Sequence, residues 1–237
     1  MTACGQQFYP PPIGRGASRI ARATMTPADI RDRLAAQRVV PVLRLASSAE
    51  TERAVDCLAE AGFRTFEITL TTPGALELIA RLAARGGWLV GAGTVLDLGA
   101  GHACLHAGAG FLVSPCLVPG MARLAHEAGR AALIGGFTPG EILAAHREGA
   151  DIVKVFPAST GGPEHLRAIH AVFPDIRLCP TGGVSLQNLA AYFAAGAALV
   201  GVGNNIVDQR ALAAGDRAQV IAHARRFLEP GAGVTAA

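Results

Sequence analysis

Lysine is almost absent from this sequence. The 237-residue chain has 21 lysines and arginines together, and only Lys154 among them is a lysine. Charged residues of both signs make up only 16% of the chain, the formal net charge is +3, and the arginines are scattered. A surface that follows a nucleic-acid backbone needs a dense basic block or stripe. We therefore expect no nucleic-acid partner.

The cysteines lack the pattern of a disulfide framework. There are five, an odd number, and none forms a CxxC pair, which favours a reducing, cytoplasmic location. The N-terminus also lacks the apolar core of a signal peptide. The longest uncharged apolar stretch, residues 189–203, is shorter than a bilayer span and is interrupted by glycines. This stretch predicts a helix, a turn and a strand, and no membrane partner is expected.

Apolar residues, in contrast, are abundant. They make up 51% of the chain, which is enough for a deep core in one large α/β domain. Residues 1–24 are rich in proline, glycine and arginine and have no periodicity, so we predict a disordered extension before a domain at 25–230. Translation from Met25 would remove this extension. Residues 231–237 are predicted to be a flexible tail.

One unit recurs between residues 38 and 228: a short apolar run, a turn, an amphipathic helix and a glycine. In the first unit, VVPVLRL precedes a helix in which Ser47 and Glu50 have capping-box spacing and Gly62 marks the end. Regular alternation of strands and helices indicates a parallel sheet with right-handed crossovers. Eight strands and eight helices in roughly 200 residues predict a single-domain (β/α)8 TIM barrel of the α/β class. An open doubly wound sheet is the alternative if one strand is assigned wrongly.

Polar or turn-forming residues end each predicted strand. They are spaced by about one strand–helix unit, at Arg44, Glu67, Thr94, Pro115, Gly136, Lys154, Thr181 and Gly203. In a TIM barrel the C-terminal strand ends meet at one mouth, where these enzymes carry out their chemistry. We therefore expect these residues to form a ring around a site.

Lys154 is the ring residue with the most specific chemistry. Burial disfavours the ammonium form and lowers the pKa of a lysine, which leaves an amine that can attack a carbonyl and form a Schiff base. The alternative is a structural ion pair with Glu67. Because the chain uses arginine at every other basic position and only lysine forms an imine, we favour the catalytic interpretation. Glu67, on the same strand face as Thr69, would transfer protons or balance the charge of Lys154.

Other features carry weaker signals. The turns PTGGV (180–184) and VGVGNN (200–205) follow the seventh and eighth predicted strands and predict a phosphate site made of backbone N–H groups. His102 and His106 have the spacing of zinc ligands, but no third ligand lies near them, so we predict no metal and no cofactor. Cys116 and Cys179 fall in predicted strands and are interpreted as small core residues rather than nucleophiles.

Six motifs together resemble the family of 2-keto-3-deoxy-6-phosphogluconate (KDPG) and 4-hydroxy-2-oxoglutarate (KHG) aldolases. VVPVLR, FEITLTTP, GAGTV, FLVSPCL, KVFPAS and CPTGGV follow one another in that family's order. The resemblance implies a class I aldolase on a TIM barrel, without a metal and forming a homotrimer. It implies cleavage of KDPG to pyruvate and glyceraldehyde 3-phosphate, with KHG as a second substrate, so the expected partners are a keto acid and a sugar phosphate.

The same resemblance implies roles for individual residues. Lys154 matches the Schiff-base lysine and Glu67 the proton-transferring glutamate. The matched substrate-binding positions are Arg44, Thr69, Thr94, Pro115, Phe156 and Thr181, and the matched phosphate-binding positions are Thr181, Gly182, Gly183, Gly203 and Asn204. Two residues depart from the pattern: Thr71 replaces an arginine that binds the substrate carboxylate in many members, and Asn204 replaces a serine.

Three alternatives remain open at this point. A galactonate-type phosphate aldolase would use the same lysine on substrates of opposite C4 configuration. A phosphosugar isomerase would use Glu67 and the phosphate loops without an imine. A barrel that only binds a sugar phosphate as a sensor would show ligand-dependent stabilisation without turnover.

Overall fold

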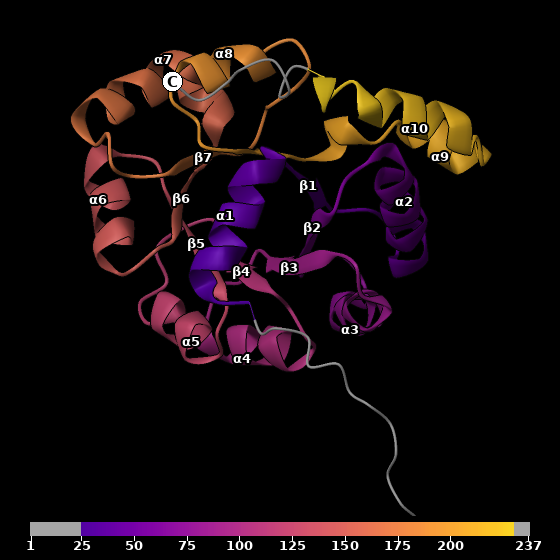
Figure 1. Cartoon of the computed structure of the whole chain (residues 1–237), viewed down its shortest axis with the longest axis horizontal. Coiled ribbons are helices and arrows are strands. Elements are labelled where there is room, and N and C mark those ends of the chain that lie inside the picture. The colour runs from indigo at the N-terminus through magenta and orange to yellow at the C-terminus, as the bar shows by residue number, and fades with distance from the viewer. Residues whose placement is uncertain (1–24, 230–237) are drawn as a thin grey trace, which may run out of the picture.

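Eight parallel strands form the centre of the computed structural model, which describes residues 25–229. The strands are β1 (Val39–Leu43), β2 (Thr65–Thr69), β3 (Leu89–Gly93), β4 (Phe111–Val113), β5 (Ala131–Gly136), β6 (Ile152–Val155), β7 (Leu178–Pro180) and β8 (Val200–Val202). They pair in the order β7-β6-β5-β4-β3-β2-β1-β8. Two isolated parallel bridges, Leu178↔Ala197 and Thr181↔Gly201, link the two ends of the sheet and bring the barrel close to closure (Figure 1). The predicted TIM barrel is confirmed.

Helices alternate with the strands and surround the barrel (Figure 1). They are α1 (Pro27–Gln37), α2 (Ser48–Ala61), α3 (Ala75–Arg85), α4 (Leu98–His106), α5 (Met121–Glu127), α6 (Pro139–Arg147), α7 (Ala158–Val172), α8 (Leu189–Ala194), the 3-10 helix η1 (Asn204–Ile206), α9 (Gln209–Ala214) and α10 (Arg217–Arg225). Every strand residue is buried, as expected for a parallel sheet that is covered on both faces. The described helices include none that is long and apolar enough to cross a bilayer.

The local start and end signals of the sequence lie close to the observed helix boundaries. Pro73 and Pro119 each lie two residues before the first residue of a helix, α3 and α5 respectively. At α2 the Ser47 hydroxyl accepts a hydrogen bond from the Glu50 N–H (3.2 Å), so the predicted cap is present, but within the described chain only this half of the capping box forms. Helix α9 was not predicted. The predicted terminal extensions lie outside the described residues.

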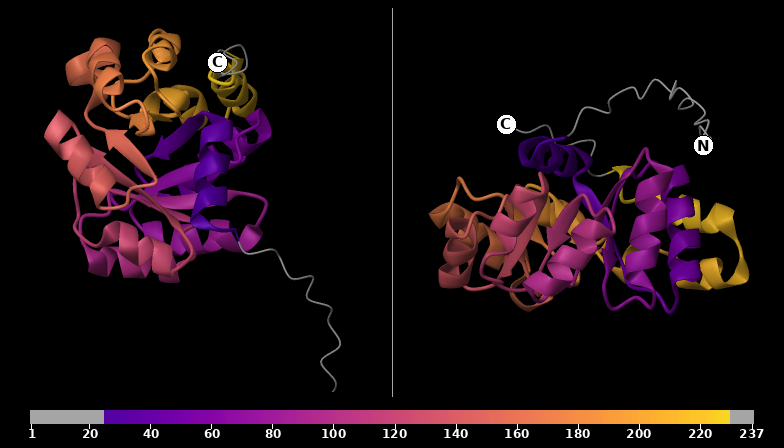
Figure 2. Two further views of the ribbon diagram at one scale, coloured as in Figure 1. Left: turned by 60° about the vertical axis from the view of Figure 1, so that its left-hand side comes forward. Right: turned by 90° about the horizontal axis from the view of Figure 1, so that it is seen from below.

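Helix α1 closes the end of the barrel at which the strands begin. Its first turn is fixed by a full capping box between Thr26 and Asp29. Ile30 and Leu34 are fully buried in the core inside the barrel, where they join Phe111 of β4. Figure 2 shows α1 lying over one end of the barrel. The core inside the barrel is therefore covered by α1 at the end where the strands begin.

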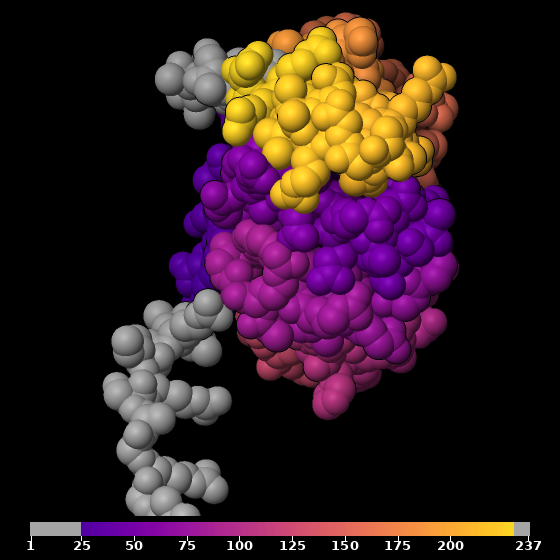
Figure 3. Space-filling model, turned by 90° about the vertical axis from the view of Figure 1, so that its right-hand side faces the viewer, coloured from indigo at the N-terminus to yellow at the C-terminus, as the bar shows by residue number. Residues whose placement is uncertain are grey.

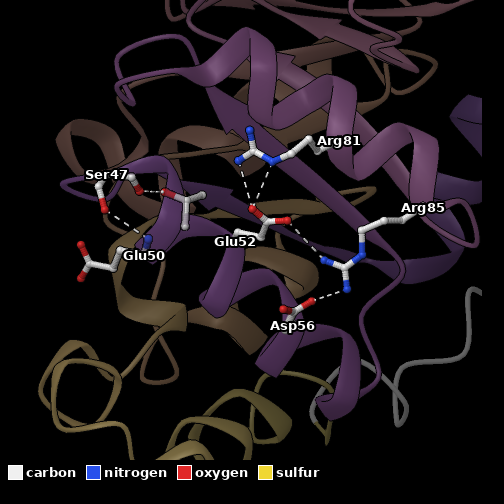
Figure 4. Close-up of polar contacts among 7 residues, drawn as sticks. Ser47, Glu50, Glu52, Asp56, Arg81 and Arg85 are labelled. Carbon is white, nitrogen blue, oxygen red and sulfur yellow. Dashed lines mark hydrogen bonds and ion pairs between the residues drawn. The ribbon is translucent and has the colours of Figure 1, made fainter.

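Neighbouring helices are joined by ion pairs on the outside of the barrel. Figure 3 shows the C-terminal helices over the N-terminal ones, where Arg217 of α10 pairs with Glu60 of α2 at 2.9 Å. Figure 4 shows Glu52 of α2 facing Arg81 and Arg85 of α3, with an Arg81–Glu52 distance of 3.0 Å. Because exposed pairs stabilise by only about 0.2–1 kcal/mol each, the buried core supplies most of the stability.

Leu34→Ala should lower the free energy of unfolding by about 2–5 kcal/mol, because it leaves a cavity where α1 meets the barrel interior. Chemical denaturation measures this change. Val172→Ala, at an exposed position of α7, serves as the control and should stay within about 0.5 kcal/mol of wild type. Equal stability of the two variants would contradict the role assigned to α1.

Candidate active site

A cavity of about 300 Å³ lies at the C-terminal ends of the strands. It is lined by Val42, Arg44, Glu67, Thr69, Thr94, Lys154, Phe156, Thr181, Gly182, Gly183, Val184, Gly203, Asn204 and Asn205. Most of the ring expected from the sequence is therefore assembled here. Pro115 and Gly136 line a neighbouring cavity, which shares only Phe156 with this one.

Lys154 and Glu67 meet inside the mouth of the barrel. Lys154 Nζ lies 3.6 Å from Glu67 Oε1, and the two side chains are only 6% and 4% exposed. The residues come from β6 and β2, which are separated by three strands, so both side chains reach into the interior. Glu67 Oε1 has no hydrogen-bond partner within the described chain. This buried oxygen can exchange a proton with a molecule that enters the cavity.

Glycine in β3 makes room for the Glu67 carboxylate. A Cβ atom on Gly93 would lie 2.0 Å from Glu67 Oε1, and one on Gly91 would lie 2.3 Å from the Phe111 ring. No side chain larger than hydrogen fits at either position. This constraint was not predicted, although the sequence carries a sign of it: two glycines at i and i+2 in a predicted strand indicate close approach by another group.

Thr94 follows Gly93 in a strained conformation. Its φ is 60°, a left-handed value that is rare for a β-branched residue and is found most often at functional sites. Its side chain lines the cavity. Thr69 also lines the cavity, but its hydroxyl lies 3.1 Å from the Leu43 carbonyl and 2.9 Å from the Thr71 hydroxyl. The Thr69 hydroxyl is thus engaged by neighbouring groups of the protein, whereas Thr94 combines a position in the cavity lining with a left-handed backbone.

The two glycine-containing turns lie together on one side of the cavity. Gly182 and Gly183 have φ values of 89° and 81°, which glycine adopts without strain. The Ser159 N–H donates to the Gly182 carbonyl (2.9 Å), which fixes the turn against the residues that follow Lys154. Asn205, a residue that the sequence analysis missed, donates from Nδ2 to the Val184 carbonyl (3.1 Å) and joins the two turns.

The charged side chains of the cavity favour an anionic ligand. Arg44 is exposed at the rim and has no ion pair within residues 25–229. The cavity lining therefore contains two basic side chains, Arg44 and Lys154, and one acidic side chain, Glu67. A molecule with a carboxylate or a phosphate therefore complements the site.

The two cysteines at the strand ends differ. Cys179 is buried in β7, as predicted, and burial raises the pKa of its thiol to about 11. The interpretation of Cys116 as a core residue in a strand is wrong, because β4 ends at Val113 and Cys116 is exposed. The Ser114 hydroxyl bonds to the Cys116 carbonyl (2.6 Å) in the turn that directs the chain outward. This turn also carries Pro115 away from the Lys154 cavity.

His102 and His106 are exposed on α4, outside the barrel. In the part of the chain that the structure describes, histidine, cysteine and acidic side chains form no group of three or more that could hold a metal ion. The residues of the cavity itself include one carboxylate and no histidine. The reactive side chains that line the cavity are the amine of Lys154 and the carboxylate of Glu67, with hydroxyl, amide and guanidinium groups around them.

Comparison with known proteins agrees with this geometry. A family model described as KDPG and KHG aldolase matches residues 30–223. This chain belongs to the KDPG and KHG aldolase family. Aldolases of this family are lyases. The 2-dehydro-3-deoxy-phosphogluconate aldolase of Pseudomonas aeruginosa is 40% identical over 194 residues, which cover 81% of this chain and 88% of that protein.

Two further relatives extend the comparison within the KDPG and KHG aldolase family. A probable 2-dehydro-3-deoxy-6-phosphogalactonate aldolase of Rhizobium meliloti is 39% identical over 75% of this chain and 85% of its own length. The crystal structure of the KDPG aldolase of Legionella pneumophila, with pyruvate captured as a covalent carbinolamine, has a TM-score of 0.77 at 28% identity. The match covers 86% of this chain and 98% of that one.

Gly93→Ala should lower kcat/KM for aldol cleavage by about 100-fold, because the new methyl group displaces the Glu67 carboxylate from Lys154. Steady-state kinetics measure the loss. Gly140→Ala is the matched control, since a Cβ there meets no atom within 4 Å. This control should keep full activity and gain about 0.4–1 kcal/mol of stability. Full activity of Gly93→Ala would show that Gly93 does not position Glu67.

Proposed function

We propose that this chain is a class I aldolase that cleaves KDPG to pyruvate and glyceraldehyde 3-phosphate, and KHG to pyruvate and glyoxylate. The observation that carries the proposal is the buried Lys154 amine, 3.6 Å from a Glu67 oxygen that accepts no hydrogen bond within the described chain, in a cavity that suits an anion. An amine forms an imine with a ketone, and a carboxylate beside it moves the protons that this chemistry requires.

The reaction begins at the C2 ketone of the substrate. The neutral amine of Lys154 adds to C2, and the resulting carbinolamine loses water to give an iminium ion. Glu67, through a bridging water, supplies the proton that the departing hydroxyl needs. The iminium is an electron sink for the electrons of the C3–C4 bond.

Bond cleavage then requires a base. Glu67 removes the proton of the C4 hydroxyl, the C3–C4 bond breaks, and C4 leaves as an aldehyde while its bonding electrons form an enamine on C2 and C3. Protonation of C3 restores the iminium. Addition of water and loss of the amine release pyruvate and regenerate Lys154.

Two anionic groups of the substrate fit the two sides of the cavity. The phosphate lies against the backbone of Gly182, Gly183 and Gly203, with Thr181 and Asn204 as side-chain donors. Thr94 and the exposed Arg44 bind the rest of the keto acid. The residues of this site need no metal or cofactor for the steps above.

Incubation with pyruvate and borohydride should convert the imine to a stable secondary amine on Lys154, detectable by intact mass and peptide mapping. Lys154 is the only side-chain amine, so a single adduct identifies the site. Lys154→Met should lose both the adduct and at least about 1,000-fold in kcat. An isomerase or a binding protein would give no adduct. Retained cleavage by Lys154→Met would refute the imine mechanism.

The relative from Rhizobium meliloti makes cleavage of the galactonate substrate a second candidate function, because the two substrates differ only at C4. We expect KDPG to be cleaved with a kcat/KM about tenfold or more above that of its C4 epimer. A coupled assay for pyruvate release on both epimers measures this ratio. The inverse ratio would assign the chain to the second function.

We also propose that the chain forms a homotrimer, as the family resemblance implies. Leu96 and Leu117, in the loops after β3 and β4, are 58% and 37% exposed, and Leu98 at the start of α4 is 37% exposed. Exposed apolar side chains of this size favour contact with another protein surface. Sedimentation velocity should give the mass of three chains. Leu96→Asp should shift the distribution toward smaller species, and a monomeric wild type would contradict the proposal.

A further inference from the structure

A second cavity lies at the end of the barrel opposite Lys154. It has a volume of about 430 Å³, and we name it the basal cavity; its lining includes Arg33, Trp88, Leu89, Gly108, Gly110 and Arg130. Trp88, Gly110 and Arg130 immediately precede β3, β4 and β5, whereas the Lys154 cavity lies at the other ends of the strands. No residue lines both cavities, so they are separate.

Glycines allow close packing in the wall of the basal cavity. A Cβ on Gly110 would lie 2.5 Å from the Leu89 side chain, and a Cβ on Gly108 would lie 3.1 Å from that of Ala83. Gly87 has a φ of 81°, a conformation that favours glycine. The volume of the cavity, about 430 Å³, lies in the size range of known ligand sites.

The basal cavity is positively charged. Arg33 and Arg130 both line it and are half-buried, and no carboxylate lines it. Arg33 contacts only uncharged groups, the Gly87 carbonyl (3.3 Å) and the Met25 sulfur (3.9 Å). The Arg130 guanidinium has no hydrogen bond or ion pair to any described residue, although the backbone N–H of Arg130 donates to the Ala125 carbonyl (2.8 Å). Two guanidinium groups facing one cavity repel each other unless an anion lies between them.

Nearby carboxylates do not supply that anion. Asp29 caps its own helix, and Asp32 and Glu127 pair with other arginines. Residues 1–24 and 230–237 contain no aspartate or glutamate. The side chains of the terminal segments thus add no negative charge, and an anion from solution can pair with these two guanidinium groups.

We propose that the basal cavity binds a compact dianion, either a phosphate monoester or a dicarboxylate, through Arg33 and Arg130. Guanidinium groups bind carboxylate and phosphate oxygens with paired N–H donors, and Trp88 and Leu89 provide an apolar surface for the carbon skeleton. This site is independent of the aldolase chemistry.

Tryptophan fluorescence tests the proposal directly, because Trp88 is the only tryptophan of the chain and lines the basal cavity. The full chain is titrated with inorganic phosphate and, separately, with succinate, at ionic strength held constant with chloride. We expect a saturable change in Trp88 emission with at least one of the two anions. Arg33→Gln and Arg130→Gln should each weaken the apparent affinity by about tenfold or more.

Two matched variants separate this site from general effects. Arg123→Gln changes an exposed arginine with a side-chain exposure of 79%, and Arg44→Gln changes the mouth of the barrel; both should keep the Trp88 response. Circular dichroism verifies the fold of each variant, and Arg→Lys replacements, which keep the charge, should retain weaker binding. The proposal would be overturned if wild type gave no saturable response. It would also be overturned if Arg33→Gln and Arg130→Gln left the response unchanged, or if Arg44→Gln abolished it.

Discussion

The contact between Lys154 and Glu67 constrains the rest of the barrel. An amine and a carboxylate, each almost fully buried and carried by strands on different sides of the sheet, need an interior that is narrow enough to bring them within 3.6 Å. Eight strands give that diameter. The absence of a side chain at Gly93 then lets the carboxylate lie against β3 instead of being displaced. Ordinary packing rules thus hold two reactive groups in a fixed arrangement.

The two ends of the barrel differ in structure: one is packed and the other is open. At one end, α1 buries Ile30 and Leu34 against the inner core, and the strand starts are sealed except for the basal cavity. At the other end, short loops leave an open mouth whose lining is mostly polar or glycine. This division is general in TIM barrels, where the stable end and the reactive end are built from different sets of residues. Changes at the mouth can therefore alter the chemistry with little effect on stability.

Much of the fold was predictable from the sequence because the strands and helices of a parallel barrel are each specified by local sequence patterns. Each buried strand is a short apolar run, and each helix has its own start and end signals, so the β1 to β8 order followed directly. Lys154 stood out for the same reason, as one polar residue in an apolar run. The glycines of β3 indicate that some group approaches closely, but the sequence does not show that this group is Glu67. The contact depends on the direction in which the Glu67 side chain leaves β2. Cys116 was misplaced because a three-residue strand and its turn look like one longer strand.

The use of arginine at every surface basic position has a further consequence. Free aldehydes condense readily with primary amines, whereas a guanidinium, which stays protonated, is a poor partner for that condensation. A protein that releases an aldehyde at high local concentration would gradually be glycated if its exterior carried lysines. Here the only side-chain amine is inside the pocket, 5% exposed, so apart from the N-terminal amino group the exterior is protected against covalent damage by such products.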